Sequence, residues 1–207
     1  VERRTGITNV TPLVLDGDEL TLQRIEVDGQ LLPASAYVAS PDRLVLNSPP
    51  ATARFKLLIE TRIDPAHNEA LMGLYRSSNV YCTQCEAEGF RRITYFLDRP
   101  DILSVYTVRI EAVRKDAPLL LSNGNPVESG KLADGWHYAV WDDPHPKPSY
   151  LFALVAGDLG KIEDRFTTMS GREVALGIYV EHGKEQLAGY AMDALKRSMK
   201  WDEEVFG

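Results

Sequence analysis

Short apolar runs separated by turn residues constrain the fold of this chain more than any other feature. In the first third of the chain they cover residues 10–15, 20–27, 43–46 and 53–63. Val, Ile, Leu and Thr alternate with polar residues inside these runs, and the pairs Asp16-Gly17 and Asp28-Gly29 lie between them. Because this pattern is typical of β-hairpins, it predicts antiparallel sheets.

Similar runs recur in the middle of the chain, at residues 104–113, 119–121, 136–141 and 150–155. Clusters rich in Asn, Asp, Gly and Pro lie beside them at 122–126 and 142–148 and are predicted to be turns. The sequence contains no fixed-period repeat and no low-complexity tract. We therefore predict a mainly β fold.

The last quarter of the chain follows a different pattern. Residues 161–168 and 173–181 are predicted to be two strands joined by a turn at 169–171, and residues 184–206 one helix. One face of this helix is apolar and must be buried, and its residues are Leu187, Ala191, Leu195 and Met199, with Ala188 and Met192 beside them. Because the composition shifts near Gly157, we expect a first domain over 1–158 and the start of a second over 159–207, which is short of core by itself.

Composition and charge exclude several classes of protein. No apolar run in the 207 residues approaches the length of a membrane-spanning helix, so no membrane span is expected. The net charge of −7 has the wrong sign for broad binding to phosphates, which makes nucleic acid an unexpected partner. With two cysteines and no basic, apolar leader, a cytoplasmic location is expected. The opening Val1 indicates a piece of a longer protein.

The motif Cys82-Thr83-Gln84-Cys85 has the C-x-x-C spacing of redox dithiols and of half a zinc site. A redox pair is typically found in a parallel βαβ setting, whereas the neighbouring runs here predict antiparallel strands. A structural zinc site needs a second pair of ligands, but the four histidines are scattered singly. Incidental cysteines are therefore the favoured interpretation, and a C-x-x-C redox protein is a weaker alternative.

Other catalytic signatures are missing from the sequence. It has no H-E-x-x-H zinc helix, no G-x-S-x-G elbow and no glycine-rich phosphate loop. His182 is interpreted as part of a helix entry, and His67 and His145 as solvated surface residues. These residues alone assign no chemistry to the chain.

The segment from Thr83 to Arg92, followed by Asp98-Arg99-Pro100, is polar, charged and without a clean strand period. Glu86 and Glu88 precede Arg91 and Arg92 by a few positions, so carboxylates and guanidinium groups could pair across one turn of a short helix. A solvated connector with weak surface ion pairs is an equally good interpretation of the residues alone.

At this segment the chain resembles the zinc-dependent aminopeptidases of the gluzincin type. The resemblance is carried by T-Q-x-E at 83–86, R-R at 91–92 and D-x-P at 98–100, and longer strings extend it from Leu74 to Gly207. It implies a saddle-shaped antiparallel β domain with a β-sandwich-like build, followed by the first strands and helix of a thermolysin-like α/β catalytic domain.

The resemblance also implies roles for two residues. Glu86 would hold the free α-ammonium of a peptide substrate, and Gln84 would line the pocket for the first side chain. An internal peptide would leave such a carboxylate unpaired, which gives a physical reason for exopeptidase specificity. Peptides with a free N-terminus and the remainder of the catalytic domain are thus the implied partners.

No catalytic or zinc-binding residue of this family lies in the chain, so zinc is expected in the full-length enzyme and not in this part of it. The chain by itself is therefore expected to be inactive. A non-catalytic β-sandwich binding module is the main alternative, favoured by aromatic residues such as Trp136, Tyr138 and Trp141. The direction in which the Glu86 side chain points distinguishes the aminopeptidase interpretation from the binding module.

Overall fold

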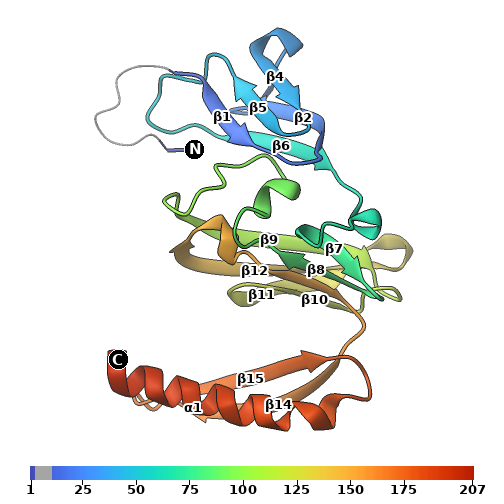
Figure 1. Cartoon of the computed structure of the whole chain (residues 1–207), viewed down its shortest axis with the longest axis vertical. Helices are drawn as coiled ribbons and strands as arrows, with labels where there is room; N and C mark the ends of the chain where they lie inside the picture. Colours follow the sequence, from blue (N-terminus) through green and yellow to red (C-terminus); the bar gives the residue numbers. More distant parts are fainter. Residues whose placement is uncertain (3–10) are drawn as a thin grey trace.

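Antiparallel strands are the main element of the structure, a computed structural model that describes residues 1–2 and 11–207 (Figure 1). Part of the run expected at 10–15 lies outside the described residues. The first strands are β1 (Leu13–Asp16), β2 (Thr21–Val27), β3 (Gln30–Leu31), β4 (Tyr37–Ser40), β5 (Arg43–Leu46) and β6 (Leu57–Arg62). They form the sheets β1-β5-β4 and β3-β2-β6, which enclose a core of Leu15, Leu20, Ile25, Leu44 and Leu46.

A second pair of sheets follows in the middle of the molecule. Its strands are β7 (Gly73–Ser77), β8 (Val80–Gln84), β9 (Ser104–Val113), β10 (Leu119–Ser122), β11 (Asn125–Lys131), β12 (Trp136–Lys147) and β13 (Leu154–Gly157). They pair in the orders β10-β13-β8-β7 and β11-β12-β9, and each pairing is antiparallel. Ile110, Leu120 and Ala156 are buried between the two sheets. The prediction of a mainly β, antiparallel fold is therefore confirmed.

The chain ends in a hairpin of β14 (Gly160–Thr167) and β15 (Glu173–Val180), which is followed by a short 3-10 turn and the helix α1 (Gly189–Phe206). Figure 1 shows this unit at the opposite end of the molecule from β1–β6. The predicted hairpin turn at 169–171 is confirmed, since Gly171 has a positive φ of 82° and its N–H donates to the carbonyl of Thr168.

The predicted buried face of the helix is only partly right. Ala188 and Met192 are buried, and Leu195 and Met199 are half-buried, whereas Leu187 is 73% exposed and Ala191 is also exposed. The buried residues therefore follow the spacing i, i+4, i+7, i+11, which fits one helical face better than a strict repeat of four. Leu187 immediately precedes Ala188, about 100° around the helix axis, and so lies off that face.

Two turn predictions in the β region are wrong in ways that matter for the topology, whereas the predicted turn at 122–126 is confirmed at Asn123-Gly124, between β10 and β11. Asp16-Gly17 does not close a hairpin, because β1 pairs with β5 and β2 pairs with β6. The cluster 142–148 mostly continues strand β12, and the cluster 122–126 contains the start of β11. Both clusters pair with neighbouring strands through bulges, which accommodate prolines at positions that would otherwise break a ladder.

In the part of the chain that the structure describes, no helix combines the length and the apolar character needed to cross a membrane.

Candidate functional site

The segment between β8 and β9 carries the candidate site. It lies between the sheets of β1–β6, the first β layer, and the middle sheets of β7–β13 (Figure 1). Gln84 is the last residue of β8, and Glu86 lies in the turn that follows. The N–H of Gly89 donates to the carbonyl of Cys85 at 2.8 Å and closes this turn. The peptide bond between Glu86 and Ala87 is cis. The side chain of Glu86 is thus presented by a closed loop.

Gly89 permits the tight closure of this turn. A Cβ atom at this position would lie 2.9 Å from Cys85 Cα, 3.0 Å from Gly73 N and closer still to the carbonyl oxygen of Gln84. These neighbours are backbone atoms, which cannot rotate away as a flexible side chain can. The loop that carries Glu86 therefore depends on a residue without a side chain.

On its N-terminal side the turn is fastened by Thr83. The Oγ1 atom of Thr83 accepts a hydrogen bond from the backbone N–H of Leu154 at 2.9 Å. This bond continues the pairing of β8 with β13, in which Cys82 lies opposite Val155. The threonine of the T-Q-x-E motif therefore has a structural role, since it fixes the end of the strand that presents Gln84.

On its C-terminal side the turn is anchored by buried aromatic rings. Phe90 packs edge-to-face on Phe96 and Phe152, with ring centroids 4.8 and 5.1 Å apart. Cys85 is buried in the same cluster, and burial, followed by the charge of Asp98, raises the pKa of its thiol to about 12. Cys82, the cysteine that would act as the redox nucleophile, lies within strand β8 and not at a helix N-terminus, which argues against the redox alternative.

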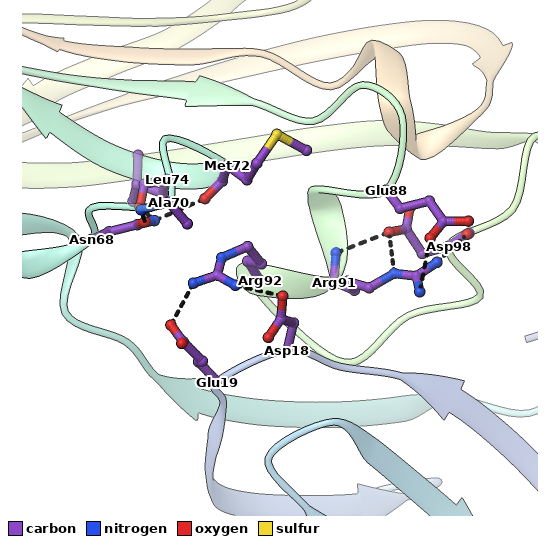
Figure 2. A network of polar contacts seen from close by, with 10 residues as sticks. All are labelled: Asp18, Glu19, Asn68, Ala70, Met72, Leu74, Glu88, Arg91, Arg92 and Asp98. Atoms are coloured by element: carbon purple, nitrogen blue, oxygen red, sulfur yellow. Dashed lines mark hydrogen bonds and ion pairs between the residues drawn. The ribbon is translucent and has the colours of Figure 1, made fainter.

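Two ionic contacts lie directly after this turn in the chain, and Arg91 and Asp98 form the first of them (Figure 2). The carboxylate of Asp98 accepts hydrogen bonds from the Arg91 backbone N–H at 3.1 Å and from Arg91 Nε at 3.0 Å. Ser149 Oγ donates to the other carboxylate oxygen at 2.5 Å. Only 3% of Asp98 is exposed, so these donors replace water around a buried charge.

Arg92 forms the second contact and points in a different direction (Figure 2). Its guanidinium pairs with Asp18 and Glu19, which lie in the connection between β1 and β2. The backbone supports the same junction, because the N–H of Asp18 donates to the carbonyl of Arg91 at 3.0 Å. The second arginine thus joins the candidate segment to the first β layer.

A neighbouring loop is ordered by Asn68, also drawn in Figure 2. The amide group of Asn68 donates to the carbonyls of Met72 and Leu74, and its oxygen accepts from the N–H of Ala70. This loop leads into β7, the strand paired with β8. A pocket of about 170 Å³ lies between it and Arg92 and is lined partly by Asp18 and Asp64.

The structure brings the two predicted substrate-binding residues together. Gln84 Nε2 donates to the backbone carbonyl of Glu86 at 3.0 Å, and both residues are exposed. The carboxylate of Glu86 makes no hydrogen bond or ion pair with any residue in the described ranges. Of the expected pairings across a turn, only that of Glu88 with Arg91 forms, at 3.3 Å, so Glu86 is left available.

Several residues that shape this site carried no assigned role in the sequence. Asp98 and Arg91 belong to recognisable motifs, but their mutual contact and the burial of Asp98 depend on the fold. Ser149 lies 51 positions from Asp98 and offers no local signal. Gly89 could have been suspected from the general preference for glycine where backbones approach closely.

The remaining titratable candidates lie elsewhere. His67 and His145 are exposed, as predicted, and His67 contacts Asp64. His182 lies before the 3-10 turn that leads into α1 and contacts Asp158 and Glu185. Within residues 1–2 and 11–207, no group of three or more His, Cys, Asp or Glu side chains could hold a metal ion. The residues described here therefore do not fit a zinc site.

The aromatic residues that suggested a binding module serve mainly in packing. The indole N–H of Trp141 donates to the carbonyl of Leu120 and so joins the two middle sheets. Tyr138 stacks against the guanidinium of Arg109, 3.7 Å from the ring centroid, and its hydroxyl donates to Glu128. Trp136, in contrast, is 44% exposed, and Tyr138 and Trp141 line a cavity of about 710 Å³, so the binding-module alternative stays a prediction.

Family membership follows from sequence comparison. A profile of the Peptidase M1 N-terminal domain family matches residues 8–151, which is well over half of the chain. The chain therefore belongs to this family, in agreement with the resemblance carried by the 83–100 segment.

Curated relatives extend the similarity over nearly the whole chain. Aminopeptidase N of Caulobacter vibrioides is 60% identical over 99% of this chain, and that of Escherichia coli K12 is 52% identical over 95%. The chain spans only 23% and 22% of the length of these two proteins. It corresponds to the N-terminal part of an M1 aminopeptidase.

Solved structures support the same fold. Aminopeptidase A of Legionella pneumophila, crystallised in complex with aspartic acid, superposes with a TM-score of 0.90 at 38% identity and covers 95% of this chain and 23% of its own. An M1 zinc metallopeptidase of Deinococcus radiodurans superposes with a TM-score of 0.70 over 90% of this chain and 44% of its own, and at 16% identity it supports the fold alone.

Proposed function

We propose that this chain is the substrate-amine-binding part of a zinc aminopeptidase, an enzyme that removes N-terminal amino acids from peptides. The observation that supports this best is the free, exposed carboxylate of Glu86 on a loop that is fastened at both ends. The family membership and the relatives named Aminopeptidase N supply the type of reaction.

In this proposal Glu86 receives the α-ammonium group of the substrate. An exopeptidase must recognise a cation at a fixed distance from the bond that is cleaved, and a fixed carboxylate does this through charge-assisted hydrogen bonds. A peptide bound at an internal residue offers no ammonium and would leave the carboxylate desolvated and unpaired. The rigid turn around Glu86 keeps the cost of ordering low on binding.

Gln84 is proposed to line the pocket for the first side chain of the substrate. Its amide N–H₂ is already directed to the carbonyl of Glu86, so the two side chains emerge from one short stretch of backbone. The hydrogen bond from Gln84 also restrains the Glu86 carbonyl. One side chain would thus serve both the shape of the subsite and the position of the anion.

Zinc is proposed for the full-length enzyme, with its ligands outside the residues described here. The described residues hold no suitable ligand group, and this chain spans about a quarter of its curated relatives. The metal would polarise the peptide carbonyl and its bound water. We propose no metal in this part of the protein and no hydrolysis by this part alone.

A domain boundary between residues 158 and 159 fits this arrangement. The β14–β15 sheet has only two strands and pairs with neither of the middle sheets. Residues 1–158 would form the N-terminal β domain, and 159–207 the start of the catalytic domain. Limited proteolysis of the full-length protein tests this, because a boundary predicts a cut near Asp158 that leaves the β domain intact.

A cytoplasmic location is proposed from the chemistry of the cysteines. Cys82 and Cys85 are both free thiols, a state that a reducing compartment maintains. Fractionation of the source cells, with activity and antibody detection, tests this location. Recovery with secreted or periplasmic markers would contradict it.

The decisive experiment on function replaces Glu86 in the full-length protein that contains this chain. Glu86→Gln keeps the size of the side chain and removes its charge, so kcat/KM for an aminoacyl p-nitroanilide is expected to fall about a hundredfold or more. Zinc content, measured by elemental analysis, is expected to stay unchanged, because Glu86 is not a ligand.

Glu69→Gln is the matched control, since Glu69 is another exposed glutamate with no ion pair among the described residues. This variant is expected to keep the wild-type kcat/KM. Wild-type turnover in Glu86→Gln would rule out the assignment of the amine site to this residue.

A further inference from the structure

The guanidinium groups of both arginines that follow Glu86 pair with other carboxylates. Arg91 Nε binds Asp98, its Nη1 contacts Glu88 at 3.3 Å, and its Nη2 donates to the carbonyl of Asp98 at 3.0 Å. Arg92 pairs with Asp18 and Glu19 (Figure 2). Glu86 lies only five positions before Arg91, yet it keeps no ionic partner among the described residues.

We propose that Asp98 is a positioning residue that holds the guanidinium of Arg91 away from Glu86 and so keeps the amine-binding carboxylate free. The inference rests on the proposed function of Glu86. Asp98 would then do more than stabilise the fold. It would restrain Arg91, a cation that could otherwise compete with the substrate ammonium for Glu86.

The physical argument starts from the number of donors on Arg91. A guanidinium has five N–H groups in a fixed fork, and an arginine with unused donors near an exposed carboxylate would pair with it. Such a pair would compete directly with a substrate ammonium. Asp98 is suited to prevent it, because it is almost fully buried and binds both the backbone N–H and Nε of Arg91.

Glu88 assists from the exposed side. Its side chain is 68% exposed and contacts Nη1, the part of the guanidinium that Asp98 does not reach. Asp16 lies 4.0 Å from Nη2 and adds a third carboxylate around the same cation. Because Asp98 makes the shortest and most buried of these contacts, its loss should release Arg91 more than the loss of Glu88.

The readout must separate this role from ordinary scaffolding. In the full-length enzyme, L-leucine and 4-methylpentanoate are compared as competitive inhibitors of aminoacyl p-nitroanilide hydrolysis. They differ only in the α-amine, so the ratio of their inhibition constants reports how strongly the enzyme recognises that group. Global destabilisation alone does not change this ratio in the folded fraction.

Asp98→Asn is expected to lower the preference for L-leucine about tenfold, because a neutral amide holds the guanidinium less strongly than a carboxylate does and the released cation occupies Glu86. Asp98→Asn combined with Arg91→Gln removes the competitor and is expected to return the preference to within about twofold of wild type. Equal loss in the single and double variants would overturn the proposal, as would an unchanged ratio in Asp98→Asn.

Glu88→Gln is the second test variant, to be used if Asp98→Asn does not fold. It changes an exposed side chain and is expected to lower the preference about twofold. The matched control is Glu111→Gln, which breaks the exposed contact with Arg109 on β9 and should leave the ratio unchanged. A ratio in Glu88→Gln that equals the control value would also overturn the proposal.

Glu86→Gln separates the failure of this inference from the failure of the proposed function. If Glu86 binds the amine, this variant reduces the preference for L-leucine to near one. If the preference survives in Glu86→Gln, the proposed function itself is wrong. If it disappears there but is unchanged in Asp98→Asn, only the positioning role is wrong.

Discussion

The carboxylate of Asp98 accepts hydrogen bonds from both the backbone N–H and the Nε of Arg91, at 3.1 and 3.0 Å, while only 3% of its surface is exposed. Removing Asp98 leaves the mostly buried charge of Arg91 with only its longer, more exposed contacts to Glu88 and Asp16. Asp98→Ala is therefore expected to lower the free energy of unfolding by about 3 kcal/mol. Chemical denaturation followed by tryptophan fluorescence measures this loss.

The control for this prediction is Asp193→Ala, which breaks an ion pair with Arg197 on the surface of α1. Both side chains are more than half exposed, so the loss of stability should be small. Equal effects of the two substitutions would show that the buried contact contributes no more than an exposed one.

Gly89→Ala is expected to distort the turn that carries Glu86. The new methyl group would lie 2.9 Å from Cys85 Cα and 3.0 Å from Gly73 N, and overpacking against backbone typically costs about 1–3 kcal/mol. Thermal unfolding measures the stability. In the full-length enzyme the same variant should raise KM for aminoacyl substrates, because the carboxylate is displaced.

Gly189→Ala is the control for Gly89→Ala and is expected to have the opposite effect on stability. Gly189 begins α1 with helical dihedral angles and has no atom within 4 Å of an added Cβ. Alanine there should stabilise the protein by about 0.5–1 kcal/mol, since it reduces the freedom of the unfolded chain and favours the helix. A loss of stability comparable to that of Gly89→Ala would contradict the steric explanation.

His182 connects the region near the proposed domain boundary to the beginning of the helix. Its Nε2 lies 2.9 Å from a carboxylate oxygen of Asp158, and this hydrogen bond, with the charges of Asp158 and Glu185, raises the pKa of the imidazole. A raised pKa in the folded state means that the contact stabilises the protein at low pH and that this contribution is lost as the pH rises through the folded pKa.

The difference in melting temperature between wild type and Asp158→Asn should therefore be larger at about pH 5 than at about pH 8. An NMR titration of the His182 ring should show a lower pKa in Asp158→Asn. A melting difference that does not vary with pH would show that the imidazolium does not contribute.

Local patterns predicted the strands well where one face is buried. Burial alternates along residues 104–111, and β9 covers 104–113, because each second side chain faces the opposite sheet. Residues 142–147 misled the prediction, since Asp and Pro favour turns locally, but the edge of β9 continues to pair with this stretch through a bulge. Tertiary pairing overrode the local preference there.

The candidate site was predictable only in part from the sequence. Gln84 and Glu86 were found from a motif resemblance, whereas composition and spacing alone left Glu86 and Glu88 as equivalent surface carboxylates. The structure separates them, because Arg91 binds Glu88 and not Glu86. Arg91 is also bound by Asp98, whose contact with Ser149 joins positions far apart in the chain and has no local sequence signal.

The last prediction concerns the two cysteines. Cys85 is buried among aromatic rings and its pKa is raised to about 12, so at neutral pH almost no thiolate is present and reagents have little access. Cys82 lies in β8 and is only half-buried. We expect iodoacetamide to modify Cys85 only after unfolding, and far more slowly than Cys82 in the native protein. Peptide mapping by mass spectrometry, with and without denaturant, measures both rates. Rapid native labelling of Cys85 would contradict its buried state.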